Sequence, residues 1–161
     1  MRVLFFGLGG VGQRHLRNLK LLQPQAKIAA VRHFKQVFEV GNDLKADPGV
    51  NIEKKYDIQV LASLEEGLKF KPDFAVVANP SSLHVETVVS LVENGTPVFV
   101  EKPLVASNEG LLKLMNLTEK EQALVMVGYQ LRFHPCVIRL KELLDQKKVG
   151  LISTVEISIH S

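Results

Sequence analysis

Cysteine and tryptophan are almost absent from this 161-residue chain, which has one cysteine and no tryptophan. A single thiol, Cys136, excludes a disulfide within the chain and is typical of a reducing compartment, so we expect a cytoplasmic protein. Apolar runs of the roughly 18 residues needed to cross a membrane are also lacking, which excludes a membrane-spanning helix. Glycines follow the apolar start where a signal peptide would have its cleavage site, so the start is expected to belong to the mature protein.

Charge of one sign is not concentrated anywhere in the chain. Twenty Lys and Arg against seventeen Asp and Glu leave a formal net charge of +3, and two tyrosines place few rings among the cations. No nucleic-acid partner is therefore predicted. With 46% hydrophobic and 23% charged residues, the composition is that of a folded domain with a sizeable core. No metal site is predicted.

Short apolar runs alternate with amphipathic stretches along most of the chain. Runs that are apolar throughout are typical of strands buried on both faces of a sheet. Strands are predicted over Val3–Phe6, Ile28–Val31, Ile58–Leu61, Phe74–Ala78, Val98–Val100 and Leu124–Val127. Helices are predicted over Val11–Leu22, from Ser63, over Ser81–Glu93 and over Ser107–Lys120. This alternation predicts an α/β fold, a doubly wound parallel sheet with helices on both faces.

One internal segment departs from this rhythm. Glycine, asparagine, aspartate and proline between Phe34 and Tyr56 favour an irregular excursion in place of a crossover helix. No function is assigned to this segment.

The sequence changes character again after Gly128. Pro135 is placed to begin a helix, and residues 151–160 then alternate between apolar and polar, as in a strand with one solvated face. We therefore expect a dinucleotide-binding Rossmann domain at residues 1–127. Residues 128–161 would form a junction helix and the first strand of a truncated second α/β domain. An edge strand on the first sheet is the alternative.

Gly7, Gly9 and Gly12 form a G-x-G-x-x-G motif between the first predicted strand and the first predicted helix. Glycines there permit a tight turn, close approach of a pyrophosphate to backbone amides, and close packing of the helix. The candidate cofactor-binding residues of this loop are Gly7, Leu8, Gly9, Gly10, Val11 and Gly12. A tight turn without a ligand is the alternative.

The end of the second predicted strand bears on the choice of cofactor. An NAD-binding fold commonly has Asp or Glu there for the ribose hydroxyls, but this chain has Arg32 and His33 and no acid before Phe38. Arg32, helped by His33 or Lys35, could bind the 2′-phosphate of NADP, so NADP is favoured slightly over NAD. Solvated charges, or a guanidinium stacked on adenine without a 2′-phosphate, are the alternatives.

Polar residues follow two later strands. Asn79, Pro80 and His84 come after the fourth predicted strand, and Glu101 and Lys102 after the fifth. Because the carboxyl ends of parallel strands share one edge of a sheet, these residues should converge on the crevice where open α/β folds bind ligands. A histidine in a first helical turn is more often a capping or surface residue, and Glu101 with Lys102 could be a strand-end ion pair.

A lysine at this edge has a chemical use. Beside a nicotinamide, the Lys102 ammonium could hydrogen-bond the substrate oxygen whose carbon exchanges hydride, and Glu101 could orient it. Gln130 and Arg132, which follow the sixth predicted strand, are further candidates at the same edge. Packing of a domain junction by the apolar residues around them is an equal alternative.

Together these motifs resemble the Gfo/Idh/MocA family, named after glucose-fructose oxidoreductase and inositol dehydrogenase. The resemblance spans essentially the whole chain: Gly7-x-Gly9-x-x-Gly12, Asn79-Pro80-Ser81-x-x-His84, Glu101-Lys102-Pro103 and Gly128-Tyr129-x-x-Arg132-Phe133-x-Pro135. It implies an amino-terminal Rossmann domain, a carboxy-terminal domain with a large antiparallel sheet, and NAD(P)-dependent oxidation or reduction of hydroxyl and keto groups on sugars, nucleotide sugars or cyclitols.

The resemblance also implies roles for single residues. Lys102 would be the catalytic lysine and, like Glu101, would contact the cofactor. Asn79, Pro80 and His84 would border its nicotinamide half. Arg32 would lie near the adenosine ribose. Arg132 and Gln130 would lie near the nicotinamide or the domain junction, although many relatives have Asn at the position of Gln130.

The family's second active-site motif, an Asp and a His three residues apart in the second domain, has no counterpart here. We therefore expect the chain to bind nucleotide without turning over substrate by itself. A non-catalytic NAD(P)-sensing module is the alternative function, and a binder of S-adenosylmethionine is a less favoured one. A nucleotide sugar or an amino sugar is the first expectation for the substrate. The resemblance to the family also allows a homo-oligomer.

Overall fold

The computed structural model of the chain describes residues 1–32, 37–105 and 107–158. The chain forms two compact units, Met1–Gly128 and Tyr129–Ser161. No helix of the described residues is long and apolar enough to cross a membrane.

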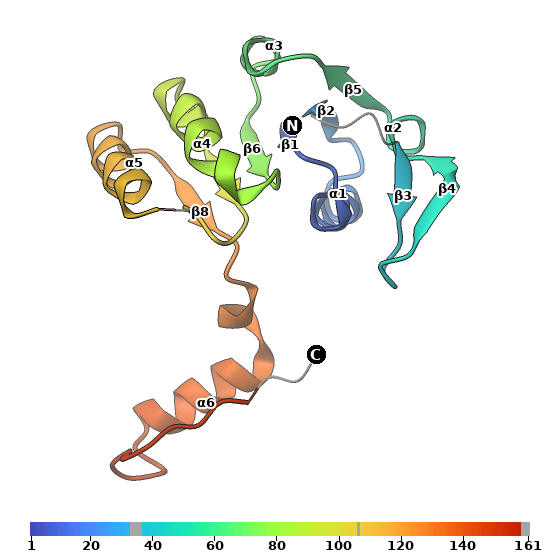
Figure 1. Ribbon diagram of the computed structural model, residues 1–161. Coiled ribbons are helices and arrows are strands. Elements are labelled where there is room, and N and C mark those ends of the chain that lie inside the picture. Colours follow the sequence, from blue (N-terminus) through green and yellow to red (C-terminus); the bar gives the residue numbers. More distant parts are fainter. Residues whose placement is uncertain (33–36, 106, 159–161) are drawn as a thin grey trace. The chain divides into compact units, whose positions relative to one another are not determined.

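The first unit is built on a parallel sheet. Six strands of the described residues pair in the order β5-β2-β1-β6-β7-β8, with β5 and β8 at the two edges (Figure 1). The strands are β1 (Arg2–Phe6), β2 (Lys27–Val31), β5 (Ile58–Leu61), β6 (Phe74–Val77), β7 (Val98–Val100) and β8 (Val125–Val127). After β1, the chain adds β2 and β5 on one side of β1. It then returns and adds β6, β7 and β8 on the other side. This reversal creates a crevice between β1 and β6 at their carboxyl ends.

Both faces of the sheet are buried at its central strands. Val3 and Phe5 of β1 belong to one hydrophobic cluster, and Leu4 and Phe6 belong to another, because successive side chains of a strand point to opposite faces. The main covering helices are α1 (Gly10–Leu22), α3 (Leu64–Lys69), α4 (His84–Glu93) and α5 (Asn108–Lys120). α1 joins the first cluster, whereas α3, α4 and α5 join the second. The predicted doubly wound α/β fold is confirmed.

The segment expected to be irregular has a regular structure in its described part. β3 (Phe38–Val40) and β4 (Ala46–Asn51) pair as an antiparallel hairpin, and the short helix α2 (Ile52–Lys55) follows. In the turn, the Gly41 N–H donates to the Lys45 carbonyl oxygen at 2.9 Å, and Asp43 Oδ1 accepts the Lys45 N–H at 3.1 Å. The turn-forming residues therefore close a hairpin that sequence alone did not predict, because each of its strands lacks the apolar run of a core strand.

The second unit contains a short 3₁₀ helix, η2 (Gln130–Phe133), and α6 (Pro135–Asp145). Pro135 begins α6 as predicted, and the His134 ring caps it by accepting the Cys136 N–H at Nδ1. Residues 151–158 form no strand in this structure, and the expected first strand of a second domain stays a prediction. The alternative, an edge strand on the first sheet, is not observed among the described residues. Alternation gives a strand one apolar face, but a strand forms only when a neighbour satisfies its backbone groups, and the described residues provide none.

The packing of α1 gives a test of the fold. Leu16 is fully buried in the first cluster, whereas Leu21 on the same helix is 80% exposed. Leu16→Ala should lower the free energy of unfolding by about 2–5 kcal/mol, because it removes buried methyl groups and leaves a cavity. Leu21→Ala, the matched control, should change it by less than about 0.5 kcal/mol. Equilibrium urea unfolding measures both, and equal losses would contradict this packing.

Candidate functional site

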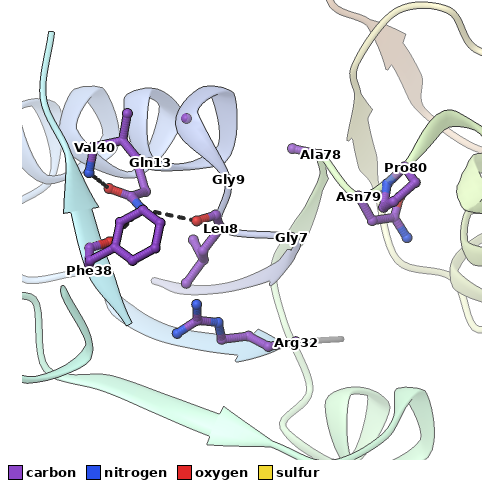
Figure 2. Close-up of a pocket in the computed structure, with 11 residues that line it drawn as sticks. Gly7, Leu8, Gly9, Gln13, Arg32, Phe38, Val40, Ala78, Asn79 and Pro80 are labelled. Carbon is purple, nitrogen blue, oxygen red and sulfur yellow. Dashed lines mark hydrogen bonds between the residues drawn. The ribbon is translucent and has the colours of Figure 1, made fainter. Parts of the chain in front are cut away.

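A cavity of about 390 Å³ opens at the carboxyl ends of β1 and β6, where the strand order reverses. Its lining comprises Gly7, Leu8, Gly9, Gly10, Gln13, Arg32, Phe38, Val40, Ala78, Asn79 and Pro80. Figure 2 shows Gln13 and Phe38 together on one side of the cavity, with Asn79 and Pro80 across the glycine loop from them. As predicted, the glycine loop, Arg32 and the segment after β6 come together at this cavity.

Each glycine of the loop is required, or has room for a side chain, for a different structural reason. Gly7 has a φ of +92°, and a Cβ there would lie 2.5 Å from the Ala78 carbonyl oxygen. A Cβ on Gly12 would lie 2.3 Å from the Gly7 oxygen. A Cβ on Gly9, by contrast, would meet no described atom within 4 Å, so this glycine leaves open space above the backbone. Gly7 and Gly12 let the loop pack against β6, and Gly9 keeps the cavity accessible.

The N-terminus of α1 faces this open space. Gly9 is the N-cap residue, and no side chain caps the helix start within the described part of the chain. The first amides of a helix have no partner inside the helix and carry its positive dipole end, which makes them suitable for binding an anion.

Asn79 adds an unsatisfied acceptor to the opposite wall. Its side chain is 7% exposed, and Nδ2 donates to Thr87 Oγ1 at 3.1 Å. Thr87 Oγ1 in turn donates to the Leu83 carbonyl at 2.8 Å, which leaves it free to accept from Asn79 and fixes the orientation of the amide. Asn79 Oδ1 is then buried without a hydrogen-bond partner among the described residues. Such an atom is rare in native proteins, and a water molecule or a bound ligand with a donor group would satisfy it.

His84 lies behind the cavity and not at its surface. The ring is 1% exposed, with Nδ1 2.8 Å from the Pro103 carbonyl oxygen and Nε2 2.9 Å from the Asn79 carbonyl oxygen. The alternative of a capping or surface histidine is therefore wrong, because the ring joins the segment after β6 to the segment after β7. Its role at the border of a nicotinamide stays a prediction.

Glu101 is held by a residue that the sequence analysis did not select. His15, on α1, places Nε2 2.7 Å from Glu101 Oε1, and its ring packs edge-on against Phe99. Glu101 Oε2 accepts the backbone N–H of Lys102 at 3.2 Å. Among the ion pairs of residues 1–32, 37–105 and 107–158, Glu101 pairs with His15, so the alternative of a Glu101–Lys102 strand-end ion pair is not observed. The Lys102 side chain is exposed.

Gln13 is a second residue that sequence reasoning missed. It is 3% exposed, and its Nε2 donates to the carbonyl oxygens of Leu8 and Phe38, both at 3.0 Å. Its Oε1 accepts the Val40 N–H at 2.7 Å (Figure 2). One side chain thereby ties the glycine loop to β3. The signal that could have found it is its position three residues before Leu16, on the buried face of α1.

The remaining predicted residues lie in two places. Arg32 lines the cavity, and its side chain, 8% exposed, is paired with Glu53. His33 lies outside the described residues. Gln130 and Arg132 lie on η2 of the second unit and are exposed there, so their role as cofactor contacts stays a prediction.

Comparison with known proteins identifies the family. A sequence profile described as an oxidoreductase family with an NAD-binding Rossmann fold, GFO_IDH_MocA, matches residues 1–129. The chain belongs to the Gfo/Idh/MocA family of oxidoreductases. The predicted resemblance and the predicted NAD-binding fold are thus confirmed.

Inositol dehydrogenases are among the relatives of this family member. Inositol 2-dehydrogenase/D-chiro-inositol 3-dehydrogenase of Shouchella clausii is 31% identical over 157 residues, and scyllo-inositol 2-dehydrogenase (NAD(+)) of Bacillus subtilis is 27% identical over 155. The crystal structure of scyllo-inositol dehydrogenase from Lactobacillus casei with bound NAD(H) and scyllo-inositol has the same fold, with a TM-score of 0.75 at 23% identity. Each match covers 93% of this chain and 42% of the other protein.

Two glycine substitutions separate the structural from the binding role of the loop. Gly9→Ala should leave the free energy of unfolding within about 1 kcal/mol, since its Cβ has room. It should nevertheless weaken NADH binding by about tenfold or more, because the methyl group occupies space that the cofactor needs. Gly7→Ala should destabilise the fold itself by about 1–3 kcal/mol through its positive φ and the contact with Ala78. Thermal unfolding and NADH titration measure the two effects, and unchanged NADH affinity in Gly9→Ala would place the cofactor elsewhere.

Proposed function

We propose that this chain is the cofactor-binding part of a dehydrogenase that moves hydride between NAD(H) or NADP(H) and a hydroxyl or keto group of a polyhydroxylated substrate. The observation that carries the proposal is the cavity between β1 and β6, with an uncapped helix N-terminus on one wall and the unsatisfied Asn79 Oδ1 on the other. An anionic pyrophosphate fits the first, and a donor group of the same ligand fits the second.

The residues of the chain fit a dinucleotide as follows. Backbone amides from Gly9 onward would bind the pyrophosphate, with the open space above Gly9 admitting it closely. Asn79 Oδ1 would accept a hydrogen bond from a ribose hydroxyl or from the carboxamide of the nicotinamide. Arg32 would lie toward the adenosine ribose. The roles of Gly7, Leu8, Gly10, Val11, Gly12, Pro80 and Glu101 as cofactor-binding residues belong to the same proposal.

Lys102 is the proposed catalytic residue. A bound nicotinamide would supply the group that accepts or donates hydride. The exposed Lys102 ammonium can hydrogen-bond the substrate oxygen, stabilise negative charge that develops there, and hold or return its proton. The structure supports a positioning role for Glu101 through the Lys102 backbone N–H, and His15 fixes the Glu101 carboxylate. This differs from the expectation that Glu101 orients the ammonium group itself.

The substrate class proposed is a cyclitol or sugar. The inositol dehydrogenases among the relatives favour a cyclitol, whereas the sequence analysis favours a nucleotide sugar or an amino sugar. Both present adjacent hydroxyl groups to a lysine of this kind. Homo-oligomer formation and a cytoplasmic location are part of the same proposal.

The test of the proposal has a binding step and a turnover step. The 161-residue chain should bind NADH, measured by calorimetric titration. The full-length gene product that carries the chain should then reduce NAD⁺ or NADP⁺ with at least one member of a panel of inositols, sugars and nucleotide sugars. Lys102→Ala should lower kcat by about 100-fold or more with a much smaller change in NADH affinity, because its main role is proton transfer.

Lys113→Ala, an exposed lysine on α5, is the matched control and should leave kcat unchanged. Binding of NADH without turnover of any panel member would overturn the proposed dehydrogenase activity and favour the alternative of an NAD(P)-sensing module. Absence of NADH binding would overturn both.

A further inference from the structure

In the folded structure an acidic side chain lies next to the end of β2, although no acid directly follows β2 in the sequence. Glu53, at the start of α2, reaches Arg32 from 21 residues further along the chain, and Arg32 Nη1 donates to Glu53 Oε1. The Arg32 side chain is 8% exposed and the Glu53 side chain 24%, so the contact is largely withdrawn from solvent. A charge pair in such surroundings is screened less by water and salt than a surface pair.

The position of Glu53 is fixed by its neighbours. Asn51 caps α2, and its Oδ1 accepts the backbone N–H groups of Glu53 at 2.9 Å and Lys54 at 3.1 Å. Ile52, directly before Glu53, is fully buried in the cluster under α1, and its N–H donates to the Val37 carbonyl at 2.9 Å. The cap and the buried Ile52 therefore fix the backbone at Glu53, and this backbone holds the Glu53 carboxylate close to Arg32.

We propose that Glu53 is a specificity-determining residue that makes this site select NAD(H) over NADP(H). The inference rests on the proposed cofactor site and goes beyond it by naming the residue that chooses between the two cofactors. It reverses the sequence expectation, which favoured NADP slightly on the basis of Arg32 alone.

The physical reason is the charge already present beside Arg32. A 2′-phosphate brings close to two negative charges at neutral pH. Beside Arg32 it would meet a guanidinium whose charge Glu53 already balances, and it would lie near the Glu53 carboxylate, which repels it. Parting Arg32 from Glu53 to free the cation would leave a shielded carboxylate without its partner. A 2′-hydroxyl carries no charge and can donate to a carboxylate or accept from a guanidinium without disturbing the pair.

A second acid, on the hairpin that precedes α2, provides a matched control. Glu39, on β3, forms an ion pair with Lys55, with Nζ 2.7 Å from Oε2, and this hydrogen bond raises the pKa of Lys55 above its ordinary value of 10.5. Removing the Glu39 charge changes the net charge of the domain as much as removing that of Glu53. It does so beside a lysine that does not line the cavity.

The experiment compares NADH and NADPH affinities of the 161-residue chain by calorimetric titration. The unaltered chain should bind NADH at least about tenfold more tightly than NADPH, as one unfavourable charge contact implies. Glu53→Gln keeps the size and the acceptor oxygen but removes the charge, and should shift the affinity ratio toward NADPH by about tenfold. Glu39→Gln should leave the ratio within about twofold. The gain of NADPH affinity in Glu53→Gln should shrink at high salt, because it comes from removing a negative charge near the phosphate.

The outcomes separate this inference from the proposed function. Preference of the unaltered chain for NADPH would overturn the inference without any variant, while leaving the cofactor site in place. An unchanged ratio in a folded Glu53→Gln, with folding checked by circular dichroism, would also overturn it. Binding of neither cofactor would overturn both the inference and the proposed function.

Discussion

The close contact between the glycine loop and the end of β6 is the constraint on which the site depends. Gly7 and Gly12 leave no room for a Cβ against Ala78 and against the loop itself. Because these positions carry only hydrogen, α1 begins directly over the edge of the sheet, and its first amides face the cavity. A methyl group at either position would push the helix away from β6, and the two walls of the cavity would no longer face the same ligand.

Buried polar side chains connect the loops around this contact. Gln13 joins the glycine loop to β3, His84 joins the segment after β6 to Pro103, and His15 joins α1 to Glu101. Loops at the carboxyl edge of a parallel sheet have no sheet hydrogen bonds of their own. These side chains supply such bonds, so the loop positions are set before a ligand arrives, which lowers the ordering cost of binding.

The sequence predicted much of the fold because the relevant signals are local. Most strands of the parallel sheet are short apolar runs, and β1 shows why such a run indicates burial on both faces, since Val3 and Leu4 enter different clusters. The glycine spacing located the loop, and the parallel arrangement predicted that Asn79 would lie at the same edge. Residues 151–158 show the limit of such reasoning, because alternation alone does not provide the neighbouring strand that a ladder needs.

The sequence by itself determined the doubly wound sheet, the glycine loop and the family of this protein, because apolar runs and motif spacing act over a few residues. Only the tertiary structure decided which charges meet. Glu53 is 21 residues from Arg32 and Glu101 is 86 residues from His15, and no periodicity links such partners. Their contacts follow from where α2 and α1 pack on the sheet. The electrostatic character of the site is therefore a property of the folded arrangement and not of any one motif.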